Sequence, residues 1–185
     1  MSGILGGLIG SFPTASTNSY ESIATVTVGS GGQSSISFTS IPSTYTHLQV
    51  RGLLRTNRGL AYDSVNITAN SITSYSTHQL AGDGSSASSQ GASSAQTSIG
   101  YNNIAGNGAT SGVFSGIVLD LFDYSLTTKN KTFRYLTGYD NNGSGYINLA
   151  SGASLVTDAI TSLTFAPQNS SLFQQFSTLG LYGIK

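Results

Sequence analysis

The sequence contains two histidines, His47 and His78, and histidine is the side chain that ordinarily exchanges a proton near neutral pH. A Ser–His–acid arrangement could use either one as its general base. No Gly-x-Ser-x-Gly segment is present to supply an exposed nucleophile, and serine is too frequent for its nearness to a histidine to be informative. We therefore expect both histidines on a surface or at an interface rather than in a catalytic site.

Carboxylates are the second group that could do chemistry, because glycoside hydrolysis needs two of them flanking one bond. Asp120 and Asp123 are the only closely spaced pair. Basic residues follow at Lys129, Lys131 and Arg134, which favours surface ion pairs between neighbouring strands over catalysis. The carboxylates considered are Glu21, Asp63, Asp83, Asp120, Asp123, Asp140 and Asp158.

The segment 140–145, Asp-Asn-Asn-Gly-Ser-Gly, is rich in oxygen ligands but lacks the downstream glutamate of a calcium-binding EF-hand loop. A hairpin turn is the favoured interpretation. The chain has no cysteine, so a thiolate zinc site is excluded. The glycine-rich segments 29–32 and 106–112 lack the Lys-Ser/Thr that completes a phosphate-binding loop. We expect no metal, no cofactor and no enzyme activity.

Arg51, Arg55 and Arg58 form the densest basic cluster. Alternation along residues 47–55 places Arg51 and Arg55 on one face of a strand, opposite Leu48 and Val50. The arginines could contact an acidic partner, or they could form a solvated face.

Charge is otherwise scarce: 8% of the residues are charged and the formal net charge is zero, against about 25% charged residues in an average domain. Serine, threonine, asparagine and glycine take their place. Such a chain offers no electrostatic footprint for nucleic acid or anionic lipid, and no stretch approaches the roughly 20 apolar residues of a membrane span. The composition suits an all-β structural protein that packs against copies of itself.

Apolar and polar residues alternate with a period of two in many segments, as in half-buried strands. Glycine, asparagine and proline signal turns between these segments. We therefore predict antiparallel strands in a sandwich or barrel, with a first hairpin formed by residues 22–28 and 34–40. Residues 81–96 contain only small and polar side chains and are expected to form a long exposed loop, or a loop that orders only against a partner. The alternating segments contain Ala24, Val26 and Val28; Ile36 and Phe38; Leu48, Val50 and Leu54; Ile117, Leu119 and Leu121; Phe133, Tyr135 and Thr137; Leu163 and Phe165; and Leu179 and Leu181.

Residues 1–19 differ from the rest and are interpreted as an extended, apolar and glycine-rich attachment arm on a single sandwich domain of residues 20–185. A signal peptide is the weaker interpretation because no basic residue precedes the apolar run. Exposed apolar side chains cost about 25 cal/mol per Å² in water. The arm is therefore a hypothetical docking element, with Ile4, Leu5, Leu8, Ile9 and Phe12 as its contact residues.

Several segments together resemble one family: 19–29 (SYESIATVTVG), 38–52 (FTSIPSTYTHLQVRG), 129–134 (KNKTFR), 138–143 (GYDNNG) and 179–185 (LGLYGIK). These segments resemble sequences of small virion structural proteins of tailed bacteriophages, especially those that infect cyanobacteria. The resemblance runs from about Ser19 to Lys185 and includes no catalytic motif. It implies a jelly-roll-like antiparallel β-sandwich that assembles in the host cytoplasm into the virion.

The function expected on these grounds is capsid decoration, in which the protein, as a cement protein, stabilises the shell. A tail fibre or baseplate appendage that contacts the host surface is the first alternative, and a carbohydrate-binding β-sandwich module is the second. The resemblance implies a homo-oligomer, a trimer, with the major capsid protein or tail proteins as partners. Nucleic acid and membranes are not expected partners.

Overall fold

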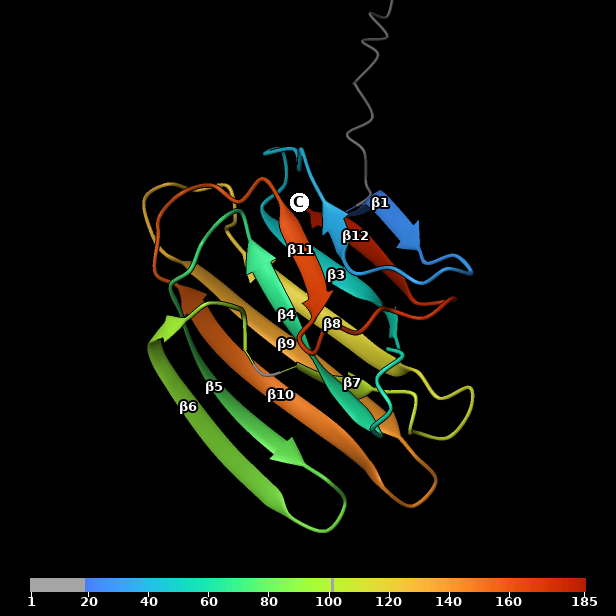
Figure 1. Cartoon of the computed structure of the whole chain (residues 1–185). Helices are drawn as coiled ribbons and strands as arrows, with labels where there is room; N and C mark the ends of the chain where they lie inside the picture. Colours follow the sequence, from blue (N-terminus) through green and yellow to red (C-terminus); the bar gives the residue numbers. More distant parts are fainter. Residues whose placement is uncertain (1–18, 101) are drawn as a thin grey trace, which may run out of the picture.

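The computed structural model describes residues 19–100 and 102–185, and it shows an all-β protein built from two antiparallel sheets (Figure 1). The prediction of an antiparallel β-sandwich is confirmed. The described residues contain no helix, and so none that is long and apolar enough to cross a membrane.

Twelve strands are present in the described part of the chain. They are β1 (Tyr20–Thr27), β2 (Ile36–Phe38), β3 (His47–Leu54), β4 (Tyr62–Ala69), β5 (Tyr75–Gly82), β6 (Ala87–Gln96), β7 (Asn102–Ala105), β8 (Ser115–Phe122), β9 (Lys131–Asp140), β10 (Gly145–Ser154), β11 (Leu163–Pro167) and β12 (Thr178–Ile184).

Eight of the strands pair in the nested order of a jelly roll. β1 pairs with β12, β2 with β11, β3 with β8 and β4 with β7, so the first strand meets the last and the pairing closes inwards. The roll divides into the strand orders β1-β12-β3-β8 and β2-β11-β4-β7. This arrangement, a long hairpin wrapped into two facing sheets, is the jelly-roll fold.

Two additional hairpins widen one sheet of the roll. β9–β10 is inserted after β8 and β5–β6 after β4, and together they extend that sheet to the order β1-β12-β3-β8-β9-β10-β5-β6. The tips of both hairpins lie at the same end of the molecule (Figure 1). The β9–β10 tip is the turn predicted for residues 140–145, with positive φ at Asn142 and Gly143 as in a type I′ hairpin turn.

The core lies between the two sheets and contains the apolar side chains that alternation had assigned to strand interiors. β9 is typical: Phe133, Tyr135 and Thr137 are buried, whereas Arg134 and Leu136 are exposed. The largest apolar side chains of the core are Tyr75, Tyr124, Tyr135, Phe133, Phe165, Phe173, Ile36, Leu48, Leu54, Ile67 and Ile99.

Two sequence-based expectations about connections are wrong. Residues 22–28 and 34–40 do not form a hairpin, because β1 pairs with β12 in one sheet and β2 pairs with β11 in the other. Residues 81–96 are not a loop. β6 covers Ala87–Gln96 and pairs with β5 through a tight turn at Asp83. An edge strand with small side chains needs no core residues, because its backbone hydrogen bonds hold it in place.

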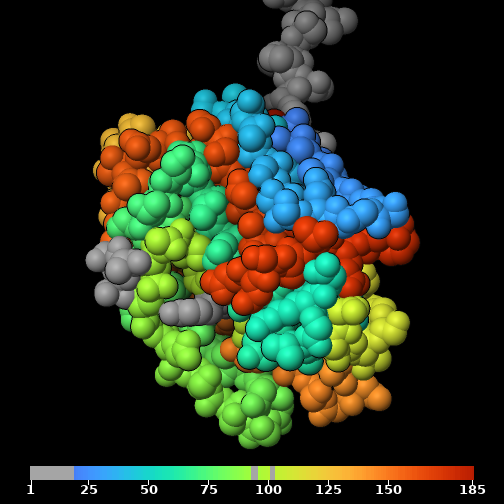
Figure 2. Space-filling view, in the orientation of Figure 1, coloured from blue at the N-terminus to red at the C-terminus, as the bar shows by residue number. Residues whose placement is uncertain are grey.

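The first described residue, Ser19, lies beside the last residue of the chain. The Lys185 amide donates to the Ser19 carbonyl oxygen at 3.1 Å, and the Lys185 ammonium lies 3.1 Å from the Glu21 carboxylate. The proposed docking residues Ile4, Leu5, Leu8, Ile9 and Phe12 lie outside the described residues. Figure 2, in the same orientation as Figure 1, shows the face formed by the four-stranded sheet and its flanking loops.

Candidate interaction face

The eight-stranded sheet has one face against the core and one directed away from the four-stranded sheet, which we call the outer face. Strand pairing places the side chains of the outer face in straight rows that cross several strands. Three adjacent rows of this face contain its polar and apolar side chains, and we name them the polar row, the leucine row and the glycine row.

The polar row consists of Tyr182, Gln49, Asp120, Arg134, Ser151 and His78, which are paired in this order across β12, β3, β8, β9, β10 and β5. Gln49 donates to an Asp120 oxygen at 2.5 Å, and Arg134 donates to the other at 2.8 Å. Tyr20, stacked on Tyr182, donates its hydroxyl to Gln49. Both carboxylate oxygens of Asp120 therefore accept hydrogen bonds, and the charge of Asp120 is balanced by Arg134.

The leucine row lies two residues further along each strand and consists of Val118, Leu136, Leu149 and Leu80, on β8, β9, β10 and β5. Two residues beyond it is the glycine row, which consists of Leu53, Gly116, Gly138, Ile147 and Gly82. On β8, β9, β10 and β5 neither row contains a polar side chain. On β3 the leucine row continues with the exposed Arg51, which is paired with Val118. Soluble monomers rarely expose apolar patches larger than a few hundred Å² unless the patch binds something.

Large aliphatic side chains are exposed along both rows. The exposed fractions are 58% for Leu80, 56% for Ile147, 48% for Leu53, 47% for Leu149 and 43% for Leu136. Between them lie shallow hollows. One of about 610 Å³ is lined by Arg51, Gly116, Leu136, Gly138 and Ile147, among others. Another of about 510 Å³ is lined by His78, Leu80, Arg134 and Leu149 together with Gly91. The missing side chains of the glycines create the hollows.

The three arginines of the basic cluster have different environments, so they do not form a common site. Arg51 is exposed on the outer face, 5.2 Å from the centre of the Tyr20 ring. Arg58 lies 3.5 Å from an Asp63 oxygen. Arg55 was expected on the same face as Arg51, but it is 4% exposed because the chain turns inwards after Leu54.

The Arg55 guanidinium is surrounded by backbone carbonyl groups of the loop between β7 and β8. It donates to Thr110 at 2.8 Å and Val113 at 2.6 Å through one nitrogen, and to Ala109 at 3.1 Å and Asn107 at 3.4 Å through the other. Burial lowers its pKa. The arrangement holds the loop 107–113 in one conformation.

Lys131 plays a similar part at the other end of the roll. Its buried ammonium donates to the carbonyl oxygens of Leu126 at 2.5 Å, Lys129 at 2.9 Å and Thr157 at 2.8 Å, and burial lowers its pKa. The expected surface ion pairs involve its neighbours: Arg134 with Asp120 at 2.8 Å, and Lys129 with Asp123 at 2.5 Å. The prediction of an ion pair between the two strands is confirmed for Arg134 with Asp120, whereas Lys129 and Asp123 pair within the connection between β8 and β9.

The two histidines lie on the surface side of the eight-stranded sheet. His47 accepts a hydrogen bond from the Asp123 amide at 3.0 Å through Nδ1, and its ring packs edge-on against Phe122. His78 is exposed on β5 and lies over Gly91 of β6, where an added Cβ would come within 2.8 Å of the ring. His47 therefore stabilises the turn at Asp123, whereas His78 lies on the outer face.

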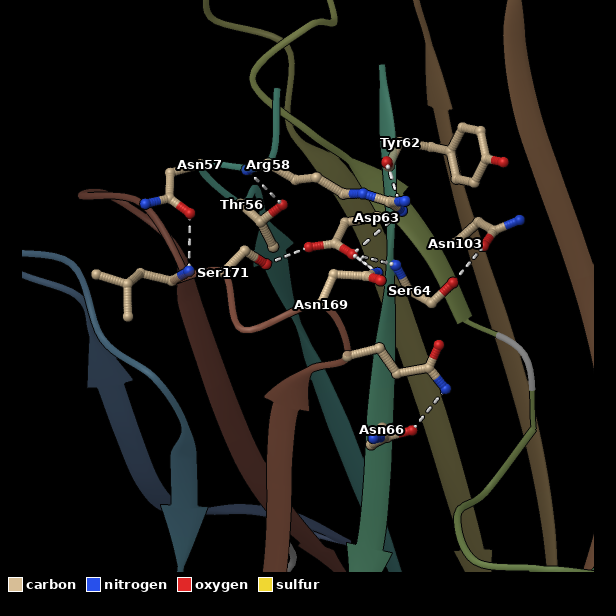
Figure 3. A network of polar contacts seen from close by, with 12 residues as sticks. Thr56, Asn57, Arg58, Tyr62, Asp63, Ser64, Asn66, Asn103, Asn169 and Ser171 are labelled. Carbon is tan, nitrogen blue, oxygen red and sulfur yellow. Dashed lines mark hydrogen bonds and ion pairs between the residues drawn. The ribbon is translucent and has the colours of Figure 1, made fainter. Parts of the chain in front are cut away.

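The most deeply buried carboxylate is Asp63, at the end of the four-stranded sheet (Figure 3). One oxygen accepts hydrogen bonds from the Ser64 amide at 2.8 Å and from Asn169 at 2.7 Å, and the other accepts from the Ser171 hydroxyl. All of these donors come from β4 or from the loop after β11. With its oxygens occupied by these donors, Asp63 ties that loop to β4 rather than forming a reactive site.

In residues 19–100 and 102–185 no three His, Cys, Asp or Glu side chains lie close enough together to hold a metal ion. The Asp140 carboxylate accepts from the Asn142 amide at 2.7 Å, and the Asn141 amide donates to the Ser144 carbonyl oxygen at 2.7 Å. The segment 140–145 is thus a hairpin turn, as predicted from the sequence.

Comparison of the chain with protein-family models, with curated proteins and with solved structures found no match.

Sequence reasoning missed the leucine and glycine rows. It placed Leu136 outwards on its strand but did not relate it to Leu149, Leu80 or Ile147, because rows across strands depend on strand order. A signal was present: Gly116 and Gly138 stand at outward positions of two long strands, where glycine weakens a strand unless something approaches closely.

Proposed function

We propose that this protein is a structural component of a bacteriophage virion that acts by binding protein surfaces, with capsid decoration as its first candidate role. One observation carries the proposal: a jelly roll widened by two hairpins presents an outer face with two rows of apolar side chains that no other part of the described chain covers. Jelly rolls recur in viral capsid proteins and in lectins. A fold shared by several functions supports the proposal only together with the face itself.

The state of the carboxylates supports a structural rather than an enzymatic role. Asp63 accepts hydrogen bonds from three residues, Asp120 from Gln49 and Arg134, and Asp123 from Lys129. Asp83 and Asp140 accept from the amides of their own turns. These groups hold strands and turns together, whereas a glycosidase needs two carboxyl groups that face each other across a substrate.

Within the same class, a tail fibre or baseplate appendage is the alternative position in the particle. The hairpin tips 83–86 and 140–145 would then be the parts that contact the host surface. Their asparagine, serine and glycine residues suit adaptable polar contacts.

A carbohydrate-binding module is the second candidate function, and one observation favours it. Tyr62 is 47% exposed, and Tyr139 and Tyr146 line a hollow of about 330 Å³ together with Asp83, Asp140 and Ser144. Sugars stack on exposed aromatic rings beside polar groups. Arg58 lies over the Tyr62 ring at 5.6 Å, which occupies part of that ring. Binding of the full chain to a glycan array, lost in Tyr146→Ala, would favour this function.

The copy number of the chain in purified phage particles tests the main proposal. Quantitative mass spectrometry against the major shell protein should give a ratio of the order of one copy per shell subunit for capsid decoration. A ratio many times smaller would place the protein in the tail. Absence from the particles would overturn the virion role and leave the sugar-binding module as the better candidate.

A further inference from the structure

We propose that the outer face binds a second copy of this chain, with the two copies related by a two-fold axis that lies between the two faces and runs across the strands. The inference rests on the proposed function in taking the face for an assembly surface. It adds the partner, the symmetry and the register. Two properties of the face carry it: the alternation of large and absent side chains, and the positions of its charges.

The area of the face limits how tightly the pair can bind. Eight strands about 4.8 Å apart, with about 3.3 Å per residue along each strand, give a face of roughly 1,000 Å² when the strands are about eight residues long, as β3, β5 and β8 are. The leucine row and the glycine row lie near one end of most of these strands, so a pair centred between the rows overlaps over roughly 600 Å² of each copy. A standard stable interface buries about 800 Å² on each partner, so the pair belongs to the class of weak, transient contacts.

The leucine row and the glycine row are complementary in shape. A two-fold axis halfway between them sets each strand over its own copy and brings one row over the other. Leu136 then faces Gly138 of the second copy, Leu80 faces Gly82, and Val118 faces Gly116. On β10 the facing residues are Leu149 and Ile147, which are both large and pack side by side. On β3 they are Leu53 and Arg51, whose guanidinium lies over the Tyr20 ring towards the edge of the sheet.

An axis along the strands fits worse. Placed between β9 and β10, it would bring Leu136 onto Leu149 and leave Gly116 opposite Gly82. Large side chains would then meet large ones in one row, while the hollow between the glycines stayed unfilled. Empty contacts lose dispersion energy and overfilled ones are strained, so the axis across the strands is favoured.

The charges at the border of the patch agree with the same axis. Arg134 lies one row before the leucine row on β9, and Asp140 lies one row after the glycine row on the same strand. The axis across the strands therefore brings Arg134 of each copy towards Asp140 of the other, once on each side of the interface. The Arg134 side chain is 59% exposed and the Asp140 residue is exposed, so both can reach a partner.

The arrangement is a known way of packing sheets. Strands of the two copies would run along a common direction, which is the aligned class of face-to-face sheet packing at about −30°. An isologous contact of this kind closes on itself and gives a dimer rather than a fibre.

Gly116 allows a sharp test, because a Cβ added there would meet nothing within 4 Å in the chain itself. Phenylalanine at this position should fit the monomer but fill the hollow that receives Val118 of the second copy. We expect Gly116→Phe in the full chain to raise the dissociation constant of the pair roughly 10- to 100-fold, with an unchanged melting temperature at concentrations where both proteins are monomeric. Sedimentation equilibrium over a range of protein concentrations measures the effect.

Gly59→Phe is the matched control, because its Cβ also meets nothing within 4 Å and the residue lies in the loop between β3 and β4. It should leave the association unchanged. Leu136→Ser removes a large exposed side chain that would face Gly138 of the second copy. It should therefore weaken the pair without adding any bulk to the face. It keeps the test valid if Gly116→Phe does not fold.

A dimer that Gly116→Phe or Leu136→Ser weakens and Gly59→Phe does not would support the inference. A monomeric wild-type chain would overturn it, as would a dimer insensitive to both variants. A trimer, as the sequence resemblance implies, would overturn the two-fold arrangement. The result is separate from the particle test: absence of the chain from particles would remove the proposed function and leave the pair intact, and a monomer found in particles would do the reverse.

Discussion

Arg55 and Ser177 hold each other through the backbone and one hydroxyl group. The Arg55 amide donates to Ser177 Oγ at 3.1 Å, and the same hydroxyl donates to the Arg55 carbonyl oxygen at 3.1 Å. Both residues are buried. This contact fixes the backbone where β3 ends, and it turns the Arg55 side chain towards the carbonyl groups of residues 107–113.

Replacing Arg55 with lysine should lower the free energy of unfolding by about 2–4 kcal/mol. Lysine keeps the charge but cannot reproduce the planar fork, so several buried carbonyl groups lose a charged donor. Urea unfolding followed by circular dichroism measures the change. Arg51→Lys, at an exposed position, is the control and should change stability by less than about 0.5 kcal/mol. Equal effects of the two variants would contradict the role assigned to Arg55.

Asp63→Asn should also destabilise the fold by about 2–4 kcal/mol, because the amide nitrogen would face donors instead of accepting from them. The loop after β11 should be released first, since Asn169 and Ser171 bind Asp63. Proteolysis within residues 167–172 is expected to be faster in the variant. Glu21→Gln, which alters an exposed ion pair, is the control and should cost less than about 1 kcal/mol.

The alkaline stability of the protein should depend on Tyr75. This side chain is fully buried, its hydroxyl contacts the backbone of Ala69, and burial raises its pKa. The folded state then keeps the proton while the unfolded chain, with a pKa of about 10, loses it. The stabilisation is fully present below about pH 10 and is lost as the pH rises through the folded pKa.

Urea midpoints measured between pH 8 and pH 11 should therefore fall for the wild type and fall less steeply for Tyr75→Phe. The variant should be less stable at pH 8, because the Ala69 amide loses its acceptor. Tyr124 and Tyr139 also have raised pKa values through burial, so part of the slope should remain. Parallel slopes for the wild type and the variant would show that Tyr75 does not contribute.

Asp83 should control the local stability of the β5–β6 hairpin. Its carboxylate accepts from the amides of Ser85 and Ser86 at 2.8 Å each, and these bonds lower its pKa. A lowered pKa means that the contribution is present above about pH 4 and is lost as the pH falls towards the folded pKa. Asp83→Ala should speed hydrogen exchange of the β6 amides, with little effect on global melting. Asp83→Asn, which keeps one oxygen acceptor, should have a smaller effect.

Much of the sandwich could be predicted from local pattern. Alternation predicts the buried face of residues such as Ile117, Leu119 and Leu121, and the Asn142-Gly143 pair predicts its turn. The pairing partners could not be predicted, since β1 finds β12 from the other end of the domain. β6 was missed because its strand is held by backbone bonds, which leave no hydrophobic pattern.

The interaction face was predictable only in fragments. The outward position of Arg134 follows from alternation, but its alignment with Asp120 and His78 requires the order of four strands. Arg55 shows the opposite failure: strand alternation continued past Leu54 puts it outside, whereas the chain leaves the strand there and the side chain becomes buried. Local periodicity cannot report where a strand stops.

The nested pairing has a consequence for how the chain reaches its native state. β1 cannot find its partner until β12, near the other end of the domain, has been synthesised, so the eight-stranded sheet is completed late. Folds dominated by such distant pairings form slowly, on the scale of milliseconds to seconds. The hairpins β9–β10 and β5–β6 have local partners and can form first. The strands that widen the sheet are thus expected to be the nucleus on which the roll closes.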